Sequence, residues 1–210
     1  MDVSQIDELR RWGEQLSRDD SQPELRSAGR AILLLIAENE RLRTTEQPPE
    51  ESGGGDEPPA AVVVPVGNGA LIGGIGRAVL AGSTATIRVG VVAAAAPVMA
   101  DSFDARRAVP GDSADTFADG LAVRVAIPYA VNLVNEVATH MLRVSERELA
   151  QAVGAFADAG IRVEGAAAAA LAALPQVPEL DGPIVLIVTG RNIDEELLNR
   201  ARNQPQAFPA

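Results

Sequence analysis

Residues 61–74 read AVVVPVGNGALIGG, and this stretch decides the fold. Its first six residues form a continuous apolar and mostly β-branched run, which is typical of a strand buried on both faces of a sheet. The run ends in Gly67-Asn68-Gly69 and passes directly into a helix predicted over residues 70–80. A glycine-rich turn between a buried strand and a helix indicates an α/β fold. Backbone amides at such a helix start can bind a phosphate or another anion.

The same alternation of strands and helices continues to the C-terminal part of the chain. Ser145 and Glu148 have the spacing of a capping box, which predicts a helix start at residue 146. Strands separated by helices imply parallel pairing through right-handed crossovers. The fold class is therefore α/β, with a partial, Rossmann-like parallel sheet flanked by helices. The predicted strands are 61–66, 86–92, 140–144 and 183–188, and the predicted helices are 70–80, 97–107, 128–138, 146–159 and 163–174.

Two further segments precede this domain. Residues 1–45 carry apolar residues at three- and four-residue steps, which predicts a helical hairpin or a coiled coil that oligomerises. Residues 46–60 are rich in proline, glycine and acidic residues and are expected to be a flexible, disordered linker. We assign residues 61–203 to the partial large domain and 204–210 to a tail.

The composition excludes several classes of function. A net charge of −11 argues against binding to nucleic acids or anionic membranes. No basic and apolar leader and no long apolar run is evident, so a cytoplasmic location is expected. All 18 basic residues are arginine, cysteine is absent and there is one histidine. The sequence therefore lacks a lysine or thiolate nucleophile and the ligands of a cysteine or multi-histidine metal site.

Five sequence blocks resemble the C-terminal portion of fold-type II (tryptophan synthase β-like) pyridoxal-phosphate enzymes. The resemblance covers about two-thirds of the chain and is strongest to the threonine/serine dehydratases, which are ammonia-lyases; threonine synthases are the second family considered. The blocks occur in the order found in the family. They are VPVGNGALIGGI (64–75), DTFADGLAV (115–123), VSERE (144–148), VEGAAAAAL (163–171) and VTGRNID (188–194).

The resemblance implies pyridoxal phosphate as the cofactor and a role for individual residues. The family's four-glycine loop around the cofactor phosphate corresponds to Gly67, Asn68, Gly69 and Ala70, so two of its glycines are replaced. Thr189 corresponds to the hydroxyl or thiol beside the pyridine nitrogen, and Arg191 replaces a family glycine two residues later. Glu164 corresponds to a glutamate beside the active site, and Asp119 and Gly120 correspond to a loop that lines the cofactor.

The same resemblance indicates what these residues lack. The family's Schiff-base lysine and its small domain belong to the first half of the enzyme, which has no counterpart here. No catalytic residue is therefore assigned, and the chain is expected to be inactive in isolation. The family's cation-binding carboxylate is also absent from residues 91–98, so no metal site is assigned.

Three hypotheses remain open at the level of sequence. The chain is a divergent or split dehydratase that needs a lysine-bearing partner, a non-catalytic oligomerisation or binding module derived from that fold, or a truncated or rearranged product. A parallel sheet separated from its neighbours has an unpaired apolar edge. We therefore expect a homo-oligomer, or a partner chain that covers this edge.

Overall fold

A computed structural model describes residues 58–210 and, before them, Arg10, Arg11, Glu14 and Arg18. The chain divides into two compact units, residues 1–55 and 56–210. Apart from those four residues, the hairpin predicted over 1–45 lies outside the described residues, as does the linker predicted over 46–60 except for residues 58–60. In the part of the chain that is described, no helix has the length and apolar character needed to cross a membrane.

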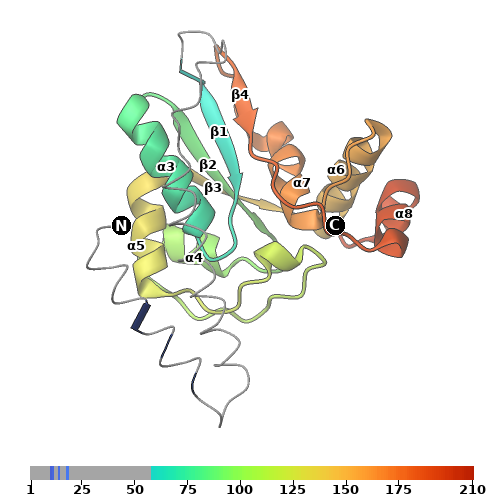
Figure 1. The fold of residues 1–210 in the computed structure, drawn as a ribbon, viewed down its shortest axis with the longest axis horizontal. Coiled ribbons are helices and arrows are strands. Elements are labelled where there is room, and N and C mark those ends of the chain that lie inside the picture. The colour runs from blue at the N-terminus through green and yellow to red at the C-terminus, as the bar shows by residue number, and fades with distance from the viewer. Residues whose placement is uncertain (1–9, 12–13, 15–17, 19–57) are drawn as a thin grey trace. The chain divides into compact units, whose positions relative to one another are not determined.

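The second unit contains a four-stranded parallel sheet, as the sequence predicts (Figure 1). Its strands are β1 (Ala61–Pro65), β2 (Ile87–Ala93), β3 (His140–Val144) and β4 (Ile184–Leu186), in the order β3-β2-β1-β4. Ala61 of β1 pairs with Ile87 on one side and with Ile184 on the other. All five residues of β1 are buried, because β1 has a neighbouring strand on each side and helices on each face.

Successive residues of the central strands contribute to two separate cores. Val63, Val89 and Val91 belong to one core, whereas Val62 and Val64 belong to the other, as the two-residue period of a strand requires. Helices α3 (Ala70–Gly82), α4 (Val98–Asp104) and α5 (Pro128–Val137) lie on one face of the sheet. Helices α6 (Glu146–Asp158), α7 (Gly165–Ala172) and α8 (Glu195–Asn203) lie on the other (Figure 1).

Helix α7 is the innermost helix of its face and is made almost entirely of alanine. It packs against β1, β2 and α6, and its residues from Gly165 to Ala170 are all buried. Small side chains allow the helix to approach both the sheet and α6 closely. The helix predicted over residues 163–174 is shorter than expected: Glu164 is its N-cap, and a 3-10 helix, η2 (Leu174–Gln176), follows it.

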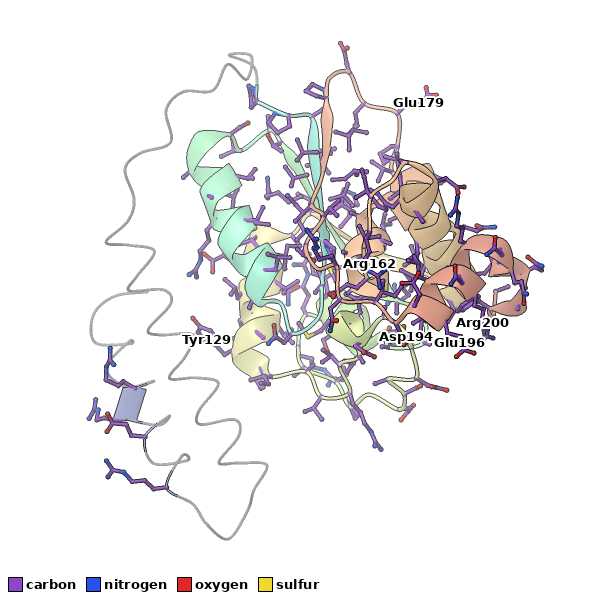
Figure 2. The ribbon with its side chains drawn as sticks, turned by 45° about the vertical axis from the view of Figure 1, so that its right-hand side comes forward. Tyr129, Arg162, Glu179, Asp194, Glu196 and Arg200 are labelled. Atoms are coloured by element: carbon purple, nitrogen blue, oxygen red, sulfur yellow. The ribbon has the colours of Figure 1, made fainter. Side chains whose placement is uncertain are left out.

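Two other parts of the fold differ from the sequence analysis or extend it. Helix α4 ends at Asp104 instead of residue 107, and Arg106 has a φ of 55°. The sequence analysis predicted no helix where α8 lies. Its N-cap is Asp194, which Figure 2 shows near Arg162. A side-chain oxygen of Asp194 accepts hydrogen bonds from the amides of Glu196 and Leu197.

The last seven residues pack against the domain. They include a 3-10 helix, η3 (Pro205–Ala207), followed by Phe208, which is buried. The rings of Phe208 and Phe117 are 5.0 Å apart between centroids. The segment assigned to a tail thus contributes an aromatic side chain to the core that contains α6 and α7.

Candidate functional site

A cavity of about 350 Å³ lies at the carboxyl end of β1. In the sheet, β2 and then β3 lie on one side of β1, and β4 pairs with β1 on the other side. The carboxyl end of such a strand is where open α/β sheets usually bind ligands. Seven of the eight residues predicted to bind a cofactor line this cavity; Asp119 does not. The lining residues are Pro65, Gly67, Asn68, Gly69, Ala70, Leu71, Gly120, Leu121, Val123, Glu164, Ala166 and Thr189.

The N-terminus of α3 forms one wall of the cavity. Its N-cap residue, Gly69, has a φ of 91°, and no side chain caps the helix at this position. Asn68 and Ala70, which the resemblance matches to two glycines of the family loop, do not have positive φ angles. Only the retained Gly69 therefore needs the left-handed conformation, and both replacements are compatible with the turn.

The loop before α3 packs tightly against the opposite wall. A Cβ atom placed on Gly67 would overlap the carbonyl oxygen of Gly120, which belongs to the 3-10 helix η1 (Asp119–Leu121). The Asn68 side chain folds back, and its Oδ1 accepts a hydrogen bond from the Ala70 amide at 3.1 Å. One amide of the potential anion site is therefore already bound to a side chain of the same loop.

Glu164 and Gly190 bring the start of α7 and the segment after β4 together. The Glu164 amide donates to the Gly190 carbonyl at 3.1 Å. A Cβ on Gly190 would overlap the Glu164 carboxylate, and an ideal Cβ on Gly120 would be 3.7 Å from Glu164 Oε1. The carboxylate thus lies between two glycines, and it has no hydrogen-bond partner or salt bridge within residues 58–210. Thr189, the residue before Gly190, lines the same cavity.

Glu146 holds the loop that carries Gly120, and the sequence analysis assigned it no role. Its Oε2 accepts a hydrogen bond from the Phe117 amide at 3.0 Å, whereas Oε1 is buried without a partner. Glu146 is the first residue of α6, and its side chain is directed to this loop instead of to solvent. No sequence signal distinguishes it, because an acidic residue in the first turn of a helix is common.

The charge inside the cavity is carried by one residue. Among the lining residues, all of which belong to the described part of the chain, Glu164 alone has an ionisable side chain. Arg191 follows Gly190 but is exposed and does not line the cavity. Within the described residues, no three His, Cys, Asp or Glu side chains are grouped so as to hold a metal ion.

Solved structures with the same fold include two threonine deaminases. The threonine deaminase of T.th. is 28% identical with a TM-score of 0.60, and the match covers 81% of this chain and 59% of that structure. The processed threonine deaminase isoform 2 of Solanum lycopersicum is also 28% identical, with a TM-score of 0.63, over 69% of this chain and 44% of that one.

Curated relatives are similar over the same region. The L-threonine ammonia-lyase of Thermotoga maritima is 32% identical over 143 residues, which are 67% of this chain and 36% of the relative. The L-threonine ammonia-lyase of Geobacter sulfurreducens is 33% identical over 139 residues, 65% of this chain and 35% of the relative. The chain thus spans about a third of the length of these relatives.

The family model for pyridoxal-phosphate dependent enzymes matches residues 49–190, which include β1 to β4, the α3 N-terminus, Glu164 and Thr189. This match spans more than half of the chain and contains every residue that lines the cavity. The chain belongs to the family of pyridoxal-phosphate dependent enzymes.

Proposed function

We propose that this chain provides the phosphate- and ring-binding part of a pyridoxal-phosphate site of the threonine/serine ammonia-lyase type, and that it is catalytically incomplete by itself. The observation that carries this proposal is that one cavity contains seven of the eight predicted residues. Its volume of about 350 Å³ is within the usual range for small-molecule sites. The proposal includes a cytoplasmic location, the one expected for an enzyme of amino-acid metabolism.

The α3 end of the cavity fits the cofactor's phosphate. The helix presents an N-terminus without a side-chain cap at Gly69 and without an acidic residue in its first turn. Unsatisfied amides and the helix dipole both favour an anion at such a position. Because a Cβ at residue 67 would overlap the Gly120 carbonyl oxygen, only a glycine at this position allows the two walls of the cavity to be this close. Gly67 and Gly69 would therefore hold the phosphate through their backbone, and Ala70 would join them where its amide is released from Asn68 Oδ1.

Thr189, in the wall of the same cavity, is suited to the pyridine ring. Thr189 offers a hydroxyl group that can donate to or accept from the ring nitrogen. When bound, the cofactor supplies an electron sink for the carbanion formed at the substrate α-carbon. Residues of this chain would orient the ring and phosphate, and Leu121, Val123 and Ala166 contribute apolar side chains to the walls.

The residue that would complete the site is absent from these 210 residues. Every basic side chain is arginine, so no side-chain amine can bond to the cofactor or remove the substrate α-proton. A lysine would have to come from another polypeptide segment. The split-enzyme hypothesis is consistent with this requirement. In the absence of such a segment, the chain acts as a pseudoenzyme.

Ligand binding and activity of the purified chain test the two halves of the proposal. We expect saturable binding of pyridoxal phosphate, weaker or no binding of pyridoxal, no side-chain adduct after borohydride treatment, and no 2-oxobutyrate from threonine. Thr189→Val should weaken pyridoxal phosphate binding about fivefold through loss of a neutral hydrogen bond, whereas the exposed control Thr84→Val should not. Equal binding of pyridoxal and its phosphate would contradict the phosphate site. Formation of 2-oxobutyrate would contradict incompleteness.

We further propose that another polypeptide covers the β4 edge, either a second copy or the lysine-bearing segment. Strand β4 has three residues and, within residues 58–210, pairs only with β1; Val185 and Val188 are 40% and 41% exposed. An unpaired strand edge with exposed apolar residues favours pairing with another chain. Sedimentation should detect a dimer or larger species that Val185→Lys dissociates. A chain that remains monomeric at all concentrations tested would leave the lysine-bearing segment as the occupant.

A further inference from the structure

We propose that Glu146 is a positioning residue for the cavity: it holds one wall in place and so sets the width that the cavity offers to a ligand with a ring. Glu146 is the first residue of α6 and does not itself line the cavity. This inference rests on the proposed function, because it requires that the cavity binds pyridoxal phosphate.

The wall that Glu146 holds belongs to a long loop. Residues 105–127 connect α4 to α5, and the 3-10 helix η1 is the one helix among these described residues. Gly120, Leu121 and Val123 of this loop line the cavity. Loops of this length with so little regular structure are uncommon in a compact domain unless they carry a function. The position of the wall therefore depends on contacts between the loop and the rest of the domain.

Within residues 58–210, one hydrogen bond connects residues 112–123 of the loop to another element. The Phe117 amide donates to Glu146 Oε2 at 3.0 Å. Every other hydrogen bond of residues 112–123 in the described part of the chain joins residues at most three apart, such as the bond from the Leu121 amide to the Ala118 carbonyl. The bond to Glu146 is therefore the polar contact through which the rest of the domain fixes this backbone.

Close packing carries the position of Phe117 to the cavity. Gly120 follows Phe117 by three residues and is confined between two other lining residues. Its carbonyl oxygen would overlap a Cβ on Gly67, and a Cβ on Gly120 itself would be 2.8 Å from the Cβ of Ala166. A shift of the loop backbone therefore changes the shape of the cavity, because tightly packed neighbours leave no space that could absorb it.

Helix capping does not account for the placement of Glu146. Ser145 and Glu148 already form the capping box of α6. The Glu146 residue is 8% exposed, and its Oε1 is buried without a hydrogen-bond partner in the described domain. Burial of a carboxylate with one oxygen unsatisfied costs stability, although the α6 dipole offsets part of this cost. The specific contribution of the side chain is the acceptor that it offers to the Phe117 amide.

The α3 end of the cavity is fixed by other contacts. A Cβ on Gly69 would be 2.8 Å from a methyl group of Val134, and a Cβ on Gly73 would overlap Leu133, so α3 packs closely on α5. These contacts do not involve the loop. Inorganic phosphate needs only the amides of the α3 N-terminus, whereas pyridoxal phosphate must also fit its ring within the walls. Loss of the Glu146 contact should therefore affect the two ligands differently.

The test measures binding of pyridoxal phosphate and of inorganic phosphate by calorimetry. Glu146→Leu removes the acceptor, so we expect about tenfold weaker binding of pyridoxal phosphate and less than about a twofold change for inorganic phosphate. Glu146→Gln removes the charge and keeps an acceptor oxygen for the Phe117 amide. This conservative variant should bind pyridoxal phosphate within about twofold of wild type.

Glu148→Leu is the matched control in the same turn of α6. It removes the carboxylate that accepts from the Ser145 amide at 2.7 Å, so it should lower the urea midpoint of unfolding, as Glu146→Leu should. Its affinity for pyridoxal phosphate should equal that of wild type, because the hydrogen bonds of the Glu148 side chain stay within the start of α6. A purely structural role of Glu146 would make the two variants alike.

Amide hydrogen exchange of the wild type tests the contact without any variant. After correction for intrinsic rates, the Phe117 amide should exchange at least about tenfold more slowly than the Asp119 amide. Asp119 is exposed, and its amide donates no hydrogen bond within residues 58–210. Equal rates would overturn the inference, and this measurement decides it if Glu146→Leu does not fold.

The outcomes distinguish this inference from the proposed function. If wild type does not bind pyridoxal phosphate, both are wrong. If wild type and a folded Glu146→Leu variant bind it equally, the inference is wrong and the proposed function stands. If Glu148→Leu weakens binding as much as Glu146→Leu does, loss of stability explains the effect and the positioning role is wrong.

Discussion

The N-termini of α6 and α3 are built in opposite ways. At α6, the Ser145 hydroxyl accepts a hydrogen bond from the Glu148 amide at 3.3 Å, and Glu148 Oε2 accepts one from the Ser145 amide at 2.7 Å. Acidic residues also occupy the first turn of α6. At α3, the N-cap is a glycine and the first turn has no acidic residue. A side-chain oxygen, Asn68 Oδ1, accepts a hydrogen bond from the Ala70 amide there.

This difference separates a structural helix end from a ligand-binding one. The capping box satisfies amides of α6 and places negative charge near the positive end of its dipole. The α3 N-terminus lacks both contributions and faces a cavity, so its remaining amides stay available to an anion. Helices α4, α5 and α7 also lack a side-chain cap, and α3 is the one of these helices that begins directly after the central strand β1.

The largest effect is expected at the α3 N-cap. Gly69→Val would place a β-branched residue at a φ of 91°, with its Cβ 2.8 Å from a methyl group of Val134. Left-handed strain and overpacking together should lower the free energy of unfolding by about 3 kcal/mol. Binding of pyridoxal phosphate should be lost as well. Urea denaturation and calorimetry measure the two effects.

Gly74→Ala is the matched control for this substitution. Gly74 lies within α3, is exposed, and has no atom within 4 Å of an added Cβ. The variant should be more stable by about 0.5 kcal/mol, because alanine loses less backbone entropy in a helix than glycine does. A Gly69→Val protein as stable as Gly74→Ala would show that the turn at Gly69 is not restricted in the way the structure indicates.

The sheet could be predicted well because its signal is local. The β-branched runs around Val63, Val91 and Ile184 are each flanked by helix-forming segments, and this pattern determines the parallel sheet. The α4 boundary was predicted too late because its polar periodicity continues through Arg107, although the backbone turns at Arg106. Helix α8 was missed although Asp194 and the two following glutamates form an N-cap signal.

The site could be predicted only in part. The strand, glycines and helix of residues 61–74 indicate an anion site from local sequence alone. Glu164, Gly120 and Thr189 were assigned by family resemblance, because nothing in their spacing shows that Glu164 meets Gly190 and Gly120. The role of Glu146 depends on a contact with Phe117, 29 residues earlier, and such tertiary contacts are not encoded in a local pattern.

The second prediction concerns the α6 capping box. Ser145→Ala removes the hydroxyl that accepts from the Glu148 amide, and the free energy of unfolding should fall by about 1 kcal/mol. Thr84→Ala, at an exposed bend after α3, should change it by less than about 0.5 kcal/mol. Neither variant should alter pyridoxal phosphate binding. An effect of Ser145→Ala on affinity as large as that of Gly69→Val would remove the distinction between the two helix ends.

The smallest effect on stability is expected at Asn68, where it separates capping from ligand binding most directly. Asn68 is exposed, and its Oδ1 occupies the Ala70 amide that an anion would use. Asn68→Ala removes this hydrogen bond and should lower the free energy of unfolding by about 0.5 kcal/mol. The variant should bind inorganic phosphate about threefold more tightly, because the Ala70 amide is released as a donor. Calorimetric titration with phosphate measures this change.

Asn68→Asp is the opposite test at the same position. A carboxylate at the start of α3 should stabilise the helix by about 0.5 kcal/mol and should weaken phosphate binding by charge repulsion. If Asn68→Ala weakened phosphate binding instead, the Asn68 side chain would have to turn and donate its amide to the anion, and the hydrogen bond to Ala70 would be a feature of the ligand-free loop alone. The two variants together therefore decide whether Asn68 competes with the ligand or binds it.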